Sequence, residues 1–173
     1  MKRVLMLAVC GLAAAIDPVL AAIQFNAPTG WTAQPPSSSM RHAQWLLPKA
    51  AGEPEDATAV IFFFGQGEGG SVADNLDRWA SQMVQTGGKP GTAQQAKTTT
   101  FSVGGVKVTT LDLSGAYAGG MGSGQAASAG RSRMKAAVVE TSAGNYFVRV
   151  LGGEKTIARW ETAIDAFFKS FRE

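Results

Sequence analysis

Cysteine and histidine are almost absent from this chain, and each absence removes a class of functional site. The 173 residues include one cysteine, Cys10, and one histidine, His42. Because Cys10 lies in an N-terminal segment that we expect to be removed, the mature protein has no thiol for a nucleophile, a thiolate metal site or a disulfide. A single histidine also excludes a metal site built from several histidines.

Long apolar runs are absent except at the N-terminus, where the pattern is typical of a secretory signal peptide. Two basic residues, 2–3, precede the apolar residues 4–16, and Asp17-Pro18 then interrupts the run. The run is too short to span a bilayer comfortably, and small residues follow it at the positions that a signal peptidase recognises. We expect cleavage after Ala21 or Ala22.

This leader divides the chain into residues 1–21, the signal peptide, and residues 22–173, one globular domain that is periplasmic or secreted. The alternative is a lipoprotein anchored through Cys10. It is disfavoured because Val9 is bulkier than the small residue usual before such a cysteine, and because the tether 11–22 is apolar.

Strong charge of one sign is absent too. The formal charge is +3, and it falls to +2 on cleavage because two cations, Lys2 and Arg3, leave with one carboxylate, Asp17. The rest of the chain has no long run of lysine and arginine and no second long apolar segment. We therefore expect no nucleic-acid partner and no membrane span in the mature chain.

Glycine, in contrast, is abundant where an aromatic segment meets a helical one, in "FFFGQGEGGSVADNLDRW". Gly65, Gly67 and Gly70 spell G-x-G-x-x-G. A dinucleotide fingerprint needs a parallel β-α-β unit, with the phosphates at the helix N-terminus. Here a hairpin follows the helix, and Glu68 would place a negative charge in the phosphate cradle. We interpret these glycines as serving the chain, which needs positive φ angles to turn from strand to helix.

Two ligand hypotheses remain open for this turn. Backbone N–H groups at the helix start are able to hold a small anion. Alternatively, Glu68, Asp74 and Asp77 bind calcium, although they lack the regular spacing of a calcium loop. The candidate binding residues of the turn are Gly67, Glu68, Gly69 and Gly70.

A second candidate is a cationic stripe. Arg131, Arg133 and Lys135 alternate along a predicted strand, so all three project from one face of the sheet. The stripe either meets an anionic ligand or an exported partner protein, or it is the solvated face of an antiparallel sheet. No cofactor is expected.

Two further features carry weaker hypotheses. His42 is the one histidine that a serine hydrolase would have to use, with one of the serines at 37–39, but no G-x-S-x-G elbow is present. We expect it to be a partly exposed strand residue. The uncharged loop Gly115–Gly130 is either a lid or a disordered connection.

Periodicity predicts an α+β domain with a mostly antiparallel sheet covered by two amphipathic helices. One helix spans residues 71–84, starting at a Ser71–Asp74 capping box, and the other follows Gly152-Gly153. Gly104-Gly105 is a two-residue hairpin connection. Strands are expected at residues 25–31, 40–47, 57–64, 97–103, 106–114, 131–141 and 146–151.

The chain resembles the PsbP-type superfamily in "FNAPTGW", in the aromatic strand and helix near Trp79, in the paired strands and in "GGEKTIARWETAIDAFFKSF". That superfamily includes extrinsic photosystem II proteins, bacterial relatives and a nuclear Ran-binding factor. The resemblance covers most of residues 25–171 and is closest to exported bacterial members with "APxGW" and "FGxGxGG". It implies an α-β-α sandwich and a non-enzymatic accessory or binding role. It carries over no catalytic or metal residues, and no photosynthetic or Ran-related role.

These observations favour an exported, non-enzymatic binding or accessory domain that acts through surface contacts. The alternative is a periplasmic hydrolase or a small-ligand-binding enzyme that uses the Gly65–Gly70 loop with Glu68, His42 or Tyr117.

Overall fold

The structure is a computed structural model that describes residues 23–119 and 130–173. The expected signal peptide, and with it Cys10, lies outside the described residues. The central part of the Gly115–Gly130 loop lies outside them as well.

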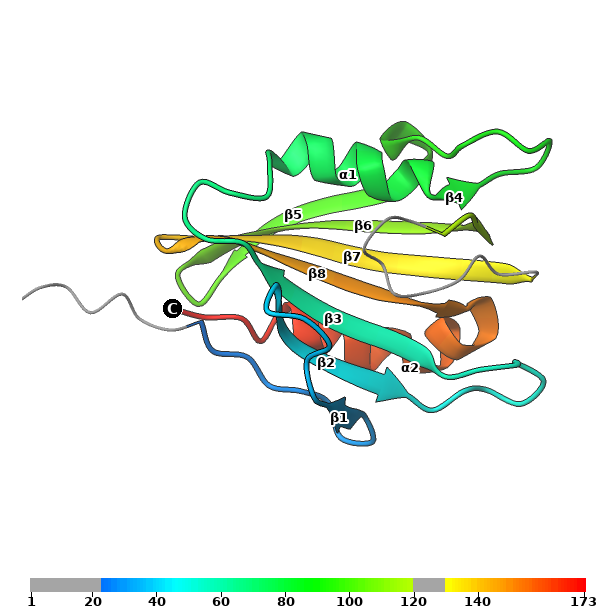
Figure 1. Cartoon of the computed structure of the whole chain (residues 1–173), viewed down its shortest axis with the longest axis horizontal. Coiled ribbons are helices and arrows are strands. Elements are labelled where there is room, and N and C mark those ends of the chain that lie inside the picture. The colour runs from blue at the N-terminus through cyan, green and yellow to red at the C-terminus, as the bar shows by residue number, and fades with distance from the viewer. Residues whose placement is uncertain (1–22, 120–129) are drawn as a thin grey trace, which may run out of the picture.

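An eight-stranded sheet forms the middle of the domain, and every pairing among its described strands is antiparallel (Figure 1). The strand order is β1-β2-β3-β8-β7-β6-β4, and β5 also pairs with β6. The strands are β1 (Thr32–Gln34), β2 (Arg41–Leu47), β3 (Ala57–Phe63), β4 (Met83–Val84), β5 (Lys97–Val103), β6 (Val106–Tyr117), β7 (Arg131–Thr141) and β8 (Gly144–Gly153).

Glycine closes the β5–β6 hairpin as predicted. Val103 pairs with Val106, so Gly104 and Gly105 alone connect the strands, with φ angles of +54° and +85°. A Cβ atom at Gly104 would lie 2.5 Å from the Cβ atom of Arg172. The turn therefore needs glycine both for its backbone conformation and for the close approach of the C-terminal segment.

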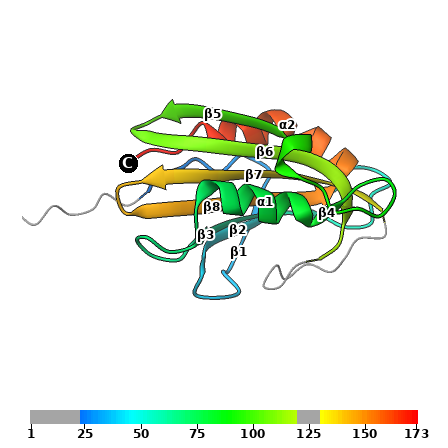
Figure 2. The ribbon, with the colours of Figure 1, turned by 90° about the horizontal axis from the view of Figure 1, so that it is seen from above.

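Two helices cover opposite faces of the sheet, α1 (Val72–Ser81) on one and α2 (Glu154–Phe168) on the other (Figures 1 and 2). Successive side chains of a strand point to opposite faces. Accordingly, Val138 packs in the α1-side core with Trp79, while its neighbour Val139 packs in the α2-side core with Phe167. The predicted α+β class, an antiparallel sheet between two amphipathic helices, is confirmed.

The prediction that the first helix reaches Val84 was wrong at its C-terminal end. The helix ends at Ser81, and Met83–Val84 forms the short strand β4, which pairs with Tyr117 and Ala116. Strand β6 accordingly extends beyond the predicted Ser114. Gly115 permits this pairing, since a Cβ atom there would lie 2.7 Å from the carbonyl oxygen of Val84.

The N-terminal strand was also misplaced. Residues 25–31 hold no strand, and β1 begins only at Thr32. Gln24 instead forms an isolated bridge with Arg172, and the backbone N–H of Asn26 donates to Ser170 Oγ at 2.9 Å. The start and the end of the described chain therefore lie side by side.

Candidate functional site

A groove lies beside α2. The helix packs mainly on β7 and β8, and residues of β5, β6 and the C-terminal half of α2 line a cavity next to this contact. The resulting cavity has a volume of about 180 Å³, and we call it the α2 groove. Strand pairing sets Lys97 beside Asp112 and Thr99 beside Thr110, and all four line the groove.

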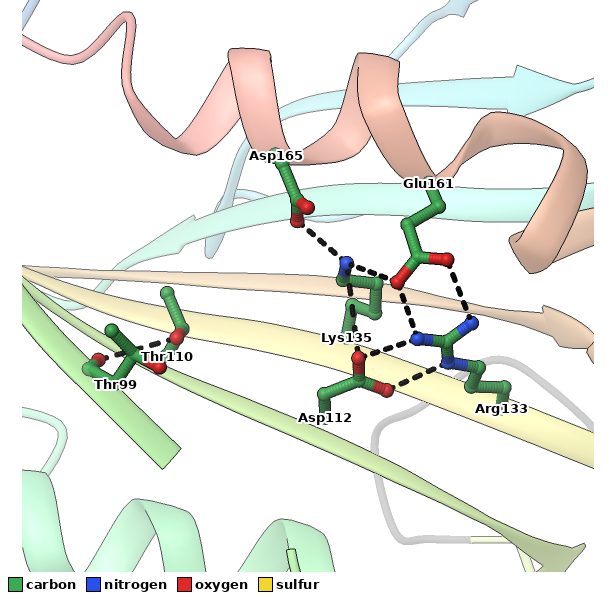
Figure 3. A network of polar contacts seen from close by, with 7 residues as sticks. All are labelled: Thr99, Thr110, Asp112, Arg133, Lys135, Glu161 and Asp165. Carbon is green, nitrogen blue, oxygen red and sulfur yellow. Dashed lines mark hydrogen bonds and ion pairs between the residues drawn. The ribbon is translucent and has the colours of Figure 1, made fainter. Parts of the chain in front are cut away.

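A network of partly buried ion pairs borders this groove (Figure 3). The Arg133 guanidinium forms a bidentate ion pair with Asp112, in which Nε lies 2.7 Å from Oδ1 and Nη2 lies 2.6 Å from Oδ2. Nη2 also donates to Glu161 Oε1 of α2 at 2.7 Å. The hydrogen bond to Asp112 raises the pKa of Arg133 above its already high value, so this side chain is a permanent cation.

Lys135 connects the same carboxylates from the next position on that face of β7. Its side chain is only 6% exposed, and Nζ lies 2.5 Å from Asp165 Oδ1, 3.4 Å from Glu161 Oε1 and 3.8 Å from Asp112 Oδ2. The hydrogen bond from Arg133, before all other causes, lowers the pKa of Glu161. Arg133 and Lys135 are therefore both matched by carboxylates in the folded chain.

The predicted cationic stripe shares one face, as its alternation requires, but α2 covers that face. Arg131 is mostly exposed and pairs with Glu154 at the start of α2, with Nε 2.7 Å from Oε2. Arg133 and Lys135 are enclosed by Asp112 and by the acids of α2. A role of these three cations in binding an anionic partner stays a prediction.

Two other lysines of the α2 groove are placed differently. Lys97 on β5 and Lys169 at the C-terminal cap of α2 line the groove and are exposed. Within residues 23–119 and 130–173, neither has a carboxylate within 4.0 Å. Sequence reasoning missed both, although the alternation in "KTTTF" and a lysine ending the apolar stripe of the last helix were visible signals.

The glycine turn positions the start of α1. All of its glycines have positive φ angles, between +77° and +111°. A Cβ atom at Gly69 would lie 2.4 Å from Phe147 Cε2, and Asn75 Nδ2 donates to the Gly69 carbonyl oxygen at 2.9 Å. These contacts agree with the interpretation that the glycines serve the chain.

The cap of α1 uses the turn as well. Asp74 N donates to Ser71 Oγ at 3.1 Å, and Ser71 N donates to Asp74 Oδ2 at 3.3 Å, which completes the predicted capping box. The side-chain hydrogen bond from Ser71 is the main cause that lowers the pKa of Asp74. Ligand binding by Gly67, Glu68, Gly69 or Gly70 stays a prediction.

The context of a dinucleotide site is missing around this turn. The strand before α1 and the strands after it pair only in antiparallel fashion in the part of the chain that the structure describes. A parallel β-α-β unit, which carries the phosphate-binding geometry, is thus not formed there.

The residues of the hydrolase hypothesis do not converge. His42 is exposed on β2, and its ring meets Phe25 and Tyr146 edge-on, on the α2 side of the sheet. Tyr117 is buried in the core on the α1 side. Because the sheet separates these two side chains, they do not form an acid–base pair.

Neither a metal-ligand cluster nor a helix able to span a membrane is present among the described residues. They contain no group of three or more side chains with metal-ligating atoms placed to share an ion. None of their helices combines the length and the apolar character that crossing a bilayer requires.

Comparison with known proteins gives a likeness in structure but none in sequence. No protein-family model matches the chain. No curated protein matches its sequence. Among solved structures, it is similar to LpqN, described as involved in cell envelope biogenesis of Mycobacterium tuberculosis. The TM-score is 0.52 at 12% sequence identity, over 91% of this chain and 86% of that chain. At this identity the likeness establishes a shared fold.

Proposed function

We propose that this chain is an exported accessory domain of a bacterial cell envelope, and that it acts by binding and not by catalysis. Residues 1–21 are its leader, and the domain from residue 22 onward works in the periplasm or outside the cell without a lipid on Cys10. Membership of the PsbP-type superfamily is part of the proposal, since that resemblance implies the same helix, antiparallel sheet and helix layering.

The observation that supports a binding role is that the carboxylates at the α2 groove are paired with cations of β7. A catalytic acid or base must lie within hydrogen-bond reach of a substrate proton and must have a pKa near the working pH. Here Asp112 and Glu161 are both held by the Arg133 guanidinium, and Asp165 is held by Lys135. Groups fixed in this way shape a surface but do not exchange protons with a substrate.

The fold likeness supports the envelope location. LpqN, which is described as acting in cell envelope biogenesis, has the same fold over most of both chains. Together with the N-terminal pattern of the sequence, this makes an accessory role in the envelope the function that fits best.

Localisation tests the first half of this proposal. The full chain with a C-terminal tag is expressed in a bacterial host, and the intact mass is measured in each cell fraction. We expect a chain shortened by 21 or 22 residues in the periplasm or medium, and a Cys10→Ala variant that behaves identically. An unprocessed cytoplasmic chain, or a membrane-bound one that Cys10→Ala releases, would contradict the proposal.

Assays of activity test the second half. The processed protein is incubated with a chromogenic ester, a phosphomonoester and a glycoside, each alongside the His42→Ala variant. We expect no turnover above the buffer rate for either protein. Turnover by the native protein that the variant loses would overturn the non-enzymatic role in favour of the hydrolase.

A further inference from the structure

We propose that the α2 groove binds a small organic anion, with its charged group on Lys97 and Lys169 and its apolar body on Phe101 and Phe168. The inference deepens the proposed function, because it names the ligand class for the same groove.

The charge balance of the groove points to an anion. Its carboxylates are Asp112 and Asp165, with Glu161 beside them, and Arg133 and Lys135 already hold these three. Lys97 and Lys169 add two cations to the lining without a carboxylate of their own among the described residues. Four cations thus face three acids, so an anionic ligand restores the balance while a cationic one meets repulsion.

Two phenylalanines also line the groove. Phe168 is 2% exposed and Phe101 is partly buried against the α2-side core, and both line the cavity. A ring or short aliphatic body placed against them leaves water, mainly on contact with the partly exposed Phe101. The groove therefore offers both cations and apolar surface, and a purely inorganic anion would use only part of it.

Two threonines add hydrogen-bonding capacity to the lining of the groove. Thr110 Oγ1 donates to the Thr99 carbonyl oxygen at 3.2 Å, and so this hydroxyl is engaged (Figure 3). The Thr99 hydroxyl makes no hydrogen bond within the described residues and lines the same cavity. It is placed to donate to an oxygen of the ligand.

Size separates a small ligand from a larger one. Sites for drug-sized molecules usually enclose about 300–1,000 Å³. The α2 groove encloses about 180 Å³, which suits a single charged group on a body of one ring or a short chain. The shared chemistry is a carboxylate or phosphate monoester, and the experiment below distinguishes these two.

Nuclear magnetic resonance titration of the processed full chain tests the inference with four probes. Phenyl phosphate and benzoate carry both an anion and a ring, inorganic phosphate carries only the anion, and benzyl alcohol carries only the ring. We expect phenyl phosphate or benzoate to shift amide signals of β5 and of the C-terminal end of α2, and the tighter of the two identifies the anion. The two partial probes should bind at least ~10-fold more weakly, a difference of about 1.4 kcal/mol.

Matched variants locate the site. The double variant Lys97→Gln/Lys169→Gln should bind the aromatic anion at least ~10-fold more weakly, and added salt should weaken binding to the native protein. Lys107→Gln removes an exposed lysine of β6 that pairs with Glu140, and should bind like the native protein. Because all three lysines are exposed, we expect each variant to fold. The dispersion of its amide signals checks this.

Several results would overturn the inference: no shifts in the groove at millimolar aromatic anion, equal binding by the double variant, or equal binding of inorganic phosphate. Hydrolysis of bound phenyl phosphate would contradict the non-enzymatic function and leave the site assignment standing. Normal export of a protein whose groove binds none of the probes would contradict the site assignment and leave the proposed function standing.

Discussion

Three lysines of the α2 groove show how position decides the role of one residue type. Lys135 is itself buried and contacts Asp112, Glu161 and Asp165, so removal of these carboxylates would leave a buried ammonium group without a partner. Lys97 and Lys169 stand at the exposed margin of the same cavity and add little to stability. We therefore propose a structural role for Lys135 and ligand contact for Lys97 and Lys169.

Gly69 gives a prediction at the residue scale. Gly69→Ala should lower the free energy of unfolding by about 1–3 kcal/mol more than Gly67→Ala, because the added methyl group clashes with the buried Phe147 ring. Both positions have positive φ, but a Cβ atom at Gly67 meets nothing within 4 Å, so that variant isolates the backbone strain. Urea denaturation followed by circular dichroism measures both. Equal losses would mean that the packing of Gly69 on Phe147 does not matter.

At the scale of elements, α2 is attached to the sheet in two ways. Its apolar stripe packs Ile157, Ile164 and Phe167 into the core. Its flank adds Glu161 and Asp165, one turn apart, which meet cations of β7 across the groove. Protonation of Glu161 and Asp165 at low pH should therefore weaken the attachment of α2 to the sheet.

The pH dependence of stability follows from Glu161. Its folded pKa is depressed, so its contribution is present above its unfolded value of about 4.5 and is lost as the pH falls through the folded value. We expect the urea midpoint to be steady from pH 7 to 5 and to fall below pH 4.5.

A matched pair of variants tests whether Glu161 causes this fall in the urea midpoint. Glu161→Gln should make the decline between pH 4.5 and 3 shallower, but not abolish it, because the pKa values of Glu154 and Asp74 are lowered as well. Glu55→Gln removes an exposed carboxylate of the β2–β3 turn that makes no ion pair among the described residues, and should leave the decline unchanged. A native decline retained in full by Glu161→Gln would refute the assignment.

Elements with local signals were predicted well from the sequence, and those that depend on distant pairing were not. The Gly104-Gly105 hairpin and the Ser71 cap follow from short stretches of chain. Met83 is apolar and falls on the helical stripe, so periodicity extended α1 through it. Only the strand pairing with Tyr117, far along the chain, shows that Met83 belongs to β4.

The candidate site was predictable in part for the same reason. Alternation placed Arg133 and Lys135 on one face, and the structure agrees. Their acidic partners on α2 lie 26 to 30 positions away, and no local pattern states that this helix covers that face. The groove beside α2 arises from the same packing, and so it could not be predicted before the packing was known.

At the scale of the whole molecule, the two faces of the sheet have different tasks in this account. On the α1 face, the glycine turn anchors the helix through Gly69 and Asn75. On the α2 face, the groove between α2 and β5 offers exposed lysines together with Phe101. We therefore propose that binding takes place on the α2 face and that the G-x-G-x-x-G turn belongs to the scaffold.

One measurement tests this central assignment most directly. A photo-crosslinking side chain is placed at Thr99 in the groove or at Glu68 in the glycine turn, and the full chain is irradiated in living bacteria. Intact-mass analysis then reports any adduct. The account predicts an adduct at Thr99 that the Lys97→Gln/Lys169→Gln variant loses, and none at Glu68. An adduct at Glu68 with none at Thr99 would contradict it and return function to the glycine turn.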